Sequence, residues 1–177
     1  MKLIIDSAVT KDQEMTPWFV DCLTKYKERG YNPTIKINPT TQEGELRNGT
    51  TYKNFLTSLE KYQGEDLLIG EDDVLIDIDF KDIKEICKPY KNCVLRVVYK
   101  KKLKNPAGKT GYYYIGNQLT YVPQDYQQEL IKIMKEYTPT HIDCFFSRCC
   151  ELNHKILPRP LGKEISHFSH TLQKFRK

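Results

Sequence analysis

The spacing of apolar and polar positions divides the first part of the chain into a strand, a helix and a second strand. Residues 2–6 form a short apolar strand of the buried kind, and the polar residues 7–15 are typical of a loop. Apolar positions in 18–26 recur at helical spacing until Gly30, which ends a helix, and residues 34–38 alternate as in a half-buried strand. This order predicts a parallel pair of strands joined by a right-handed helical crossover.

Strand and helix periodicities alternate along the rest of the chain as well. They predict a helix that begins at residues 48–51, a strand at 66–69, a short helix at 79–90, a strand at 93–99, a hairpin of 112–115 with 118–122, an amphipathic helix at 123–137, a helix that opens at 142–146, and a strand and tail within 155–177. Strands that alternate with helices predict an α/β chain.

An acidic triplet interrupts one of the apolar runs, "LLIGEDDVLI" at residues 67–76. Burying carboxylates without partners is costly, so Glu71, Asp72 and Asp73 mark either a strand end that faces solvent or a site that holds a cation. Open parallel sheets bind ligands outside the carboxyl ends of their strands, so we expect the sheet to end here and its end to be the site. In an extended chain, Glu71 and Asp73 would point to one side and Asp72 to the other.

Composition favours one folded domain. The chain has 177 residues, 39% of them hydrophobic, with twelve Tyr and seven Phe, which is enough to build a core. No apolar run approaches the roughly 20 residues of a membrane span, and the apolar start is too short for a signal peptide. We therefore expect a cytoplasmic protein whose six cysteines are reduced thiols.

The net charge of +5 is unevenly distributed, because residues 100–109 carry several lysines. A lysine-rich segment of this kind is either a solvated hairpin or a patch for a phosphate-bearing partner, which includes nucleic acid.

Closely spaced carboxylates suit a hard divalent cation, because Mg²⁺ and Mn²⁺ take oxygen ligands from one or two carboxylates and from substrate phosphates. The surrounding segment "RNGTTYKNFLTSLEKYQGEDLLIGEDDVLI" resembles the central part of nucleotide-sugar glycosyltransferases with the GT-A fold. "LLIGEDDVLI" is similar to the acidic strand end of the lipopolysaccharide-biosynthesis type, and "THIDCFF…HKILPRPLGKEISHFSH" resembles the closing part of that group. Departures are the short chain, Glu-Asp-Asp in place of a strict Asp-x-Asp, and Lys53 where relatives often have Arg.

The resemblance implies a small GT-A-like, Rossmann-related α/β fold with a mixed, mostly parallel sheet flanked by helices. Residues 1–177 would form a single domain: a nucleotide-sugar-binding half at 1–99, an acceptor-side half at 100–162 and a tail at 163–177 that is ordered only with ligand. The implied activity is metal-dependent transfer of a sugar, in the manner of a hexosyltransferase, from a nucleotide-diphosphate sugar to an acceptor hydroxyl.

The resemblance also implies roles for individual residues. Ser7 would contact the nucleotide base, while Lys53 and Asn54 would meet the diphosphate. Asp73 would be the principal metal ligand, and Glu71 and Asp72 would hold sugar hydroxyls or metal-bound water. Asp143 would be the acceptor-side carboxylate, and the general base if the enzyme inverts. Near the end of the chain, His167 or His170 would contact phosphate or metal, with His167 assigned to the substrate and His170 to the metal.

The implied cofactor is Mn²⁺ or Mg²⁺. The implied donor is a nucleotide-diphosphate sugar, with a UDP-sugar favoured, and the implied acceptor is a glycan, a protein or a modified nucleic acid. A second hypothesis is a degenerate transferase-like module that binds nucleotide or nucleic acid through residues 100–109. Four of the assigned residues also have a plain structural alternative. Lys53 could be a solvated helix residue, Asp143 an acid near a helix start, and His167 and His170 ordinary tail residues.

Overall fold

The computed structural model describes residues 1–9, 17–39, 50–99, 102–104, 112–114, 118–137, 142–164, 167–169 and 174–176. Within them, six strands form the main sheet in the order β2 (Thr34–Pro39), β1 (Lys2–Val9), β3 (Leu67–Glu71), β8 (Leu119–Val122), β5 (Val94–Val98) and β9 (His154–Ile156). β8 runs antiparallel to both of its neighbours, and the other pairs are parallel. The sheet is therefore mixed and mostly parallel, as the resemblance to GT-A glycosyltransferases implies.

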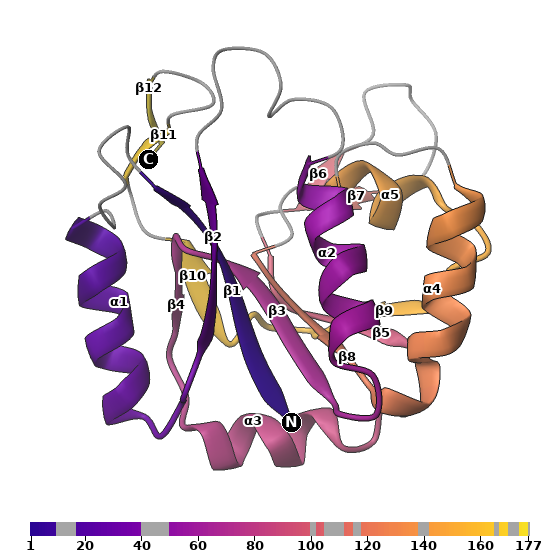
Figure 1. The fold of residues 1–177 in the computed structure, drawn as a ribbon, viewed down its shortest axis with the longest axis horizontal. Helices are drawn as coiled ribbons and strands as arrows, with labels where there is room; N and C mark the ends of the chain where they lie inside the picture. Colours follow the sequence, from indigo (N-terminus) through magenta and orange to yellow (C-terminus); the bar gives the residue numbers. More distant parts are fainter. Residues whose placement is uncertain are drawn as a thin grey trace.

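Helices cover both faces of this sheet (Figure 1). One face carries α1 (Pro17–Glu28), α3 (Phe80–Cys87) and the short strand β4 (Val74–Ile76), and the other carries α2 (Thr50–Lys61), the 3₁₀ turn η2 (Gln124–Tyr126), α4 (Gln127–Glu136) and α5 (Ile142–Arg148). Two apolar cores result, because strand residues alternate between the faces: Leu3 and Ile5 pack toward α1, whereas Ile4 packs toward α2.

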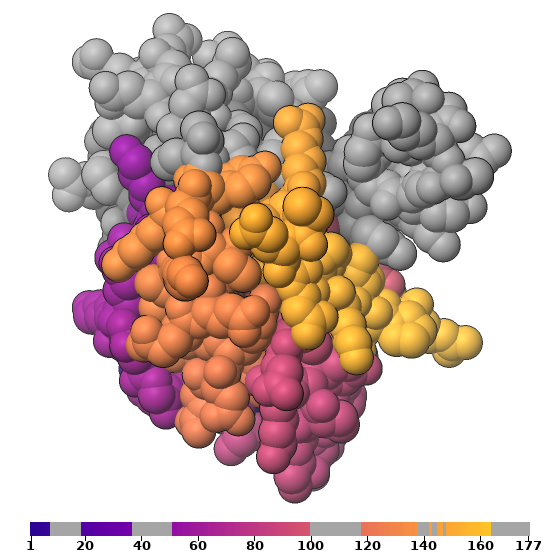
Figure 2. Space-filling model, turned by 90° about the vertical axis from the view of Figure 1, so that its right-hand side faces the viewer, coloured from indigo at the N-terminus to yellow at the C-terminus, as the bar shows by residue number. Residues whose placement is uncertain are grey.

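Three two-stranded sheets complete the described chain. β4 pairs with β10 (Gly162–Glu164), β6 (Lys102–Lys104) pairs with β7 (Tyr112–Tyr114), and β11 (His167–Ser169) pairs with β12 (Lys174–Arg176). The segment that leads from α5 to β10, yellow in Figure 2, lies on the surface beside α4, which is orange.

Tyrosine hydroxyls join elements that are distant in sequence. Tyr52 in α2 donates to the carbonyl of Met134 in α4 at 2.6 Å, and Tyr26 in α1 donates to the carbonyl of Val74 in β4. Each buried hydroxyl thus has an acceptor, which buried polar groups require, and each bond fixes a helix relative to its neighbour.

The structure confirms most predicted elements and corrects three. The 7–15 loop is wrong at its start, because β1 continues to Val9 in parallel register with β2. The hairpin within 112–122 is also wrong: β7 pairs with β6, while β8 lies between β3 and β5. β8 hydrogen-bonds to β3 on one edge and to β5 on the other, and all four of its residues are buried, so long-range pairing overrides the local turn signal. Finally, residues 155–177 contain more strand than predicted, in β10, β11 and β12.

None of the helices in the described ranges combines the length and the apolar character that crossing a bilayer requires. Among the cysteines that the structure describes, Cys22, Cys87, Cys93 and Cys149 are buried free thiols, and Cys150 is exposed.

Candidate functional site at the carboxyl edge of the sheet

Three neighbouring parallel strands bring polar side chains to the same edge of the sheet. In register, Asp6 of β1 lies opposite Lys36 of β2 on one side and Glu71 of β3 on the other. Ile4 and Ile69, two residues earlier in their strands, belong to the core beneath α2, so Asp6 and Glu71 face the same helix. The upper ends of β1 and β2 in Figure 1 mark this edge.

Among the described residues, Lys36 places a positive charge next to these acids. Its Nζ donates to the carbonyl of Asn54 at 2.8 Å and to Oγ of Ser58 at 3.2 Å, and lies 4.0 Å from Oδ1 of Asp6. Burial lowers the pKa of Lys36, and Asp6 opposes that shift. Sequence reasoning missed Lys36; its signal was a charged residue within a half-buried alternating strand.

The acidic triplet forms the end of β3 and the turn that follows it. Glu71 is the last residue of the strand, and Asp72 and Asp73 turn the chain into β4. The predicted alternation of the three side chains therefore does not apply beyond Glu71. Ser7, fully buried in β1, donates its hydroxyl to Oδ2 of Asp72 at 2.9 Å, which ties the turn to the neighbouring strand.

Asp73 lies deeper than the other two acids. It is 3% exposed, whereas Glu71 and Asp72 are half-buried. Cys22 of α1 lies close to this turn: burial raises the pKa of its thiol to about 11, with Lys25 opposing the shift and the charge of Asp73 adding to it. The thiol is thus protonated at neutral pH.

Gly70 permits β3 and β8 to approach closely beside the turn. A Cβ on Gly70 would lie 2.6 Å from the carbonyl oxygen of Gln118, which accepts a hydrogen bond from the Glu71 amide at 3.0 Å. Three of the buried polar residues in the described chain lie in this upper part of the sheet or its turn: Ser7, Asp73 and Gln118. A polar interior here departs from the apolar lower part of the sheet, as expected of a site.

The amino end of α2 also lies at this edge. Lys36, near the carboxyl end of its strand, contacts Asn54 in the first half of α2. The amide of Gly64, just after α2, donates to the side chain of Gln127 at 3.2 Å, at the opposite edge of the sheet. α2 therefore points its amino end toward the acids, with exposed Lys53 in its first turns. The amino end of a helix attracts anions such as phosphate.

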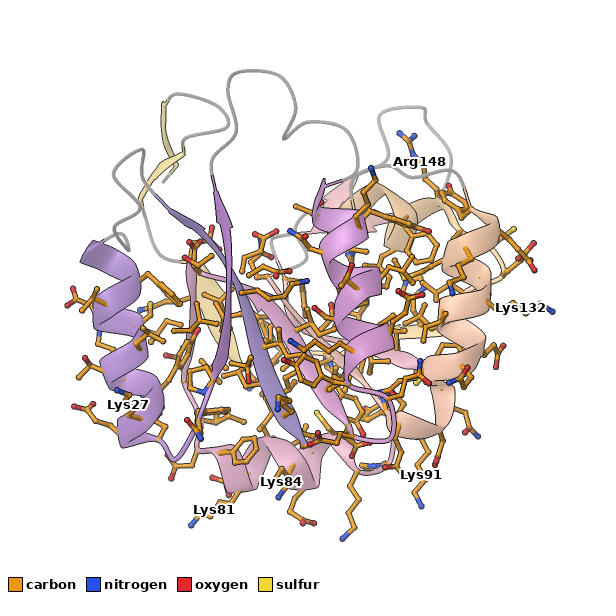
Figure 3. The ribbon with its side chains drawn as sticks, in the orientation of Figure 1. Lys27, Lys81, Lys84, Lys91, Lys132 and Arg148 are labelled. Carbon is orange, nitrogen blue, oxygen red and sulfur yellow. The ribbon has the colours of Figure 1, made fainter. Side chains whose placement is uncertain are left out.

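The lysines labelled in Figure 3 lie away from this edge. Lys81, Lys84 and Lys91 project from the lower edge, Lys27 lies on the lower part of α1, and Lys132 projects outward from α4 (Figure 3). A hollow of about 370 Å³ at the lower edge is lined by lysines and acids in equal number: Lys84, Lys88, Lys91, Asp66, Glu85 and Asp125.

The structure brings together one part of the predicted residue set. Ser7, Glu71, Asp72 and Asp73 meet at the carboxyl edge, and Lys53 and Asn54 lie on the helix that starts there. The backbone of Asp143 lies in α5 and that of His167 in β11, while their side chains, His170 and most of the 100–109 segment lie outside the described residues. Among described side chains, no three His, Cys, Asp or Glu residues gather as a ready-made metal site.

Strand β10, in the last part of the chain, runs back toward the acidic turn. In the antiparallel β4–β10 pair, Glu164 lies opposite Val74, which directly follows Asp73. His167 comes three residues after Glu164, so its Cα lies within roughly 11 Å of that of Glu164. The topology therefore keeps the backbone of His167 in the neighbourhood of the acidic turn.

No model of a known protein family matches this sequence, and no curated protein sequence matches it either. Solved structures do resemble its fold. A glycosyltransferase involved in the glycosylation of the major capsid of PBCV-1 is 12% identical, with a TM-score of 0.52, over 93% of this chain and 94% of the other.

Two further structures show a similar degree of likeness. A protein named as a glucose-1-phosphate thymidylyltransferase from Bacillus anthracis, in complex with sucrose, is 11% identical, with a TM-score of 0.50, over 88% of this chain and 86% of the other. A protein from STIV is 14% identical, with a TM-score of 0.50, over 99% of this chain and 93% of the other. The chain therefore has a GT-A-like nucleotide-sugar fold, the fold of glycosyltransferases and sugar nucleotidyltransferases.

Proposed function

We propose that this chain is a metal-dependent glycosyltransferase that moves a sugar from a UDP-sugar to an acceptor hydroxyl. The favoured sugar is a hexose. One observation carries the proposal: the acidic turn Glu71–Asp73 ends a central parallel strand, is held in place by Ser7, and lies at the same edge as the amino end of α2. That edge is where open α/β sheets bind ligands.

The side chains present suit Mn²⁺ or Mg²⁺. Such ions take one or two protein carboxylates and complete their shell with water and substrate phosphates, so a full protein cage is not needed. Asp73 is the proposed principal ligand, with His170 as a late ligand, and a bound ion would supply charge neutralisation for the departing nucleoside diphosphate.

The chain's own residues divide the remaining tasks. Glu71 and Asp72 reach the rim and hold hydroxyls of the sugar, and Ser7, being buried, orients Asp72 through its hydroxyl. Lys53 and the amino end of α2 stabilise charge on the diphosphate, and Asn54 anchors that helix through the bond between its carbonyl and Lys36.

Asp143 of α5 is the proposed general base. If the enzyme inverts, Asp143 accepts the proton of the acceptor hydroxyl, the acceptor oxygen bonds to the anomeric carbon, and the nucleoside diphosphate leaves with the electron pair of the broken bond. The chain after β10, which carries His167, would close over the donor and limit hydrolysis.

The proposal is tested by a thermal-shift screen of UDP-sugars with and without Mn²⁺, followed by assays of hydrolysis and transfer for each hit. Metal-dependent stabilisation that exceeds the effect of either component alone supports the donor site. A parallel arm with nucleoside triphosphate and sugar 1-phosphate detects nucleotidyl transfer, and salt-sensitive RNA or DNA binding without any sugar-nucleotide binding would favour the binding-module alternative instead.

Single amide substitutions then separate the three acids. Asp73→Asn should abolish transfer and the Mn²⁺-dependent shift while leaving the melting temperature without ligand little changed, because the amide keeps the volume of the buried side chain. Asp72→Asn and Glu71→Gln should weaken sugar binding and keep the metal response. Loss of stability in Asp73→Asn with transfer intact would make Asp73 a purely structural residue.

A further inference from the structure

A buried arginine lies in the middle of the sheet, in register with Thr120 on one side and Ile156 on the other. Arg96 of β5 is 1% exposed, and it is the largest of the fully buried side chains in the described chain. Burying a guanidinium costs far more than burying an apolar side chain of the same size, so a chain that needed only volume here would gain stability from methionine or leucine. The position of Arg96 therefore calls for an explanation beyond packing.

The register shows which way Arg96 points. It lies opposite Thr120 of β8 and Ile156 of β9, and Val94, two residues earlier in the same strand, belongs to the core beneath α2 and α5. Residues two apart in a strand share a face, so Arg96 faces that helical layer. Its carbonyl accepts a hydrogen bond from the Leu157 amide at 3.2 Å, so the backbone around it is fixed as well.

The helix that Arg96 meets is α5. Its guanidinium carbon lies 5.4 Å from the centre of the Phe146 ring, within the range of a cation–π contact. Phe146 in turn packs edge-on against Phe55 of α2, with ring centres 5.4 Å apart. The ring of Phe145 lies beside that of Phe146 and packs edge-on against Tyr52 of α2. α5 is thus held between the sheet and α2 by aromatic rings, and Arg96 is the charged contact from the sheet.

The charge of Arg96 acts on a titratable neighbour in the next strand. The pKa of His154, on the adjacent strand β9, is lowered by burial and by the charge of Arg96. His154 is therefore neutral at neutral pH, whereas arginine keeps its charge at every accessible pH.

We propose that Arg96 is a positioning residue that fixes α5 relative to the sheet, and with it the acceptor-side carboxylate Asp143. Asp143 precedes Phe146 by three residues in α5, so the backbone that carries Asp143 belongs to the helix that Arg96 contacts through Phe146. Through its contact with the ring of Phe146, the guanidinium holds this helix against the sheet. This inference rests on the proposed function only in the role given to Asp143; the fixing of α5 can be tested without it.

The test compares Arg96→Met, which keeps the length of the side chain, with Arg96→Lys, which keeps the charge but loses the plane. Hydrogen exchange is followed at the amides near the end of α5, such as that of Cys149, which donates to the Phe145 carbonyl at 2.9 Å. In Arg96→Met these amides should exchange about tenfold faster, as expected when a contact of this strength is lost, while those of α1 stay unchanged. Arg96→Lys should lie in between.

The kinetic readout separates positioning from mere folding. In Arg96→Met, kcat for transfer should fall and the KM of the acceptor should rise, while the thermal shift produced by UDP-sugar and Mn²⁺ is retained. If Arg96→Met does not fold, Phe146→Leu and its combination with Arg96→Lys replace it, and the double variant should exchange no faster than Phe146→Leu alone. Unchanged exchange at α5, or additive effects in the pair, would overturn the inference; wild-type protein that transfers no sugar while the exchange result holds would refute the proposed function alone.

Discussion

At the scale of single residues, the site depends on polar side chains that the fold buries and pairs. The bond from Ser7 to Asp72 joins residues 65 positions apart in sequence and links the end of β1 to the turn after β3. Ser7→Ala should lower the free energy of unfolding by about 1 to 2 kcal/mol, because it removes a buried donor from a carboxylate. Urea unfolding measures this change.

A matched hydroxyl removal provides the control for Ser7→Ala. Thr24→Ala deletes an exposed hydroxyl that donates to the Val20 carbonyl within α1, and should change stability by less than about 0.5 kcal/mol. Equal effects of the two substitutions would show that the Ser7–Asp72 bond contributes nothing specific to the turn.

Individual residues also show how far sequence reasoning reaches. The turn Glu71–Asp73 could be predicted, because three acids inside an apolar run contradict the local pattern and so mark the end of a strand. Lys36 and Arg96 could not be assigned, because their significance comes from partners in α2 and α5 that the sequence does not place beside them. Asp143, His167 and His170 keep their predicted roles as predictions.

At the scale of elements, local periodicity predicts helices better than strand partners. α1, α2 and α4 follow directly from their apolar spacing, whereas the nearby Gly-Asn turn signal predicts the wrong partner, residues 112–115, for β8. Pairing depends on what lies on both sides of a strand, and β8 fills the gap between β3 and β5. A sequence pattern shows that a strand is buried, but not which neighbours bury it.

The β4–β10 pair yields a prediction at the same scale. A Cβ on Gly162 would lie 2.3 Å from the carbonyl oxygen of Leu75, so Gly162→Ala must push β10 away from β4. We expect a loss of about 1 to 3 kcal/mol in urea unfolding, together with faster hydrogen exchange at Asp77, whose amide donates to the Leu161 carbonyl. Lys163→Ala, at the exposed neighbouring position, is the control and should leave both unchanged.

Because β10 leads the chain toward the acidic turn, Gly162→Ala should also reduce transfer more than it reduces stability at the assay temperature. Activity that follows the folded fraction and nothing else would argue against a role for the segment after β10 in the site.

At the scale of the whole molecule, the two apolar cores carry buried thiols and phenols that must remain neutral. Burial raises the pKa of Cys22 from 9.0 to about 11 and that of Cys87 from 9.0 to about 12, and it raises the pKa of Tyr52 from 10.0 to about 12. Each of these groups therefore holds its proton more tightly in the folded chain than in the unfolded one.

The sign of the resulting pH dependence follows from proton binding. Above the unfolded pKa the unfolded chain has lost protons that the folded chain keeps, so stability falls as pH rises. The contribution of these groups is complete below about pH 9 and is lost as pH rises through their folded pKa values, that is, over about pH 9 to 12. Chemical denaturation at a series of pH values should show a plateau followed by this decline.

Cys87→Ala tests the assignment of that decline to particular groups. The variant loses packing and should be less stable at pH 7, yet its stability should fall less steeply than that of the wild type over pH 9 to 12, because one titrating group has been removed. The two curves should therefore converge at alkaline pH. Parallel curves would mean that Cys87 keeps its ordinary pKa in the folded chain, and the decline would then belong to the tyrosines, which Tyr52→Phe examines in the same way.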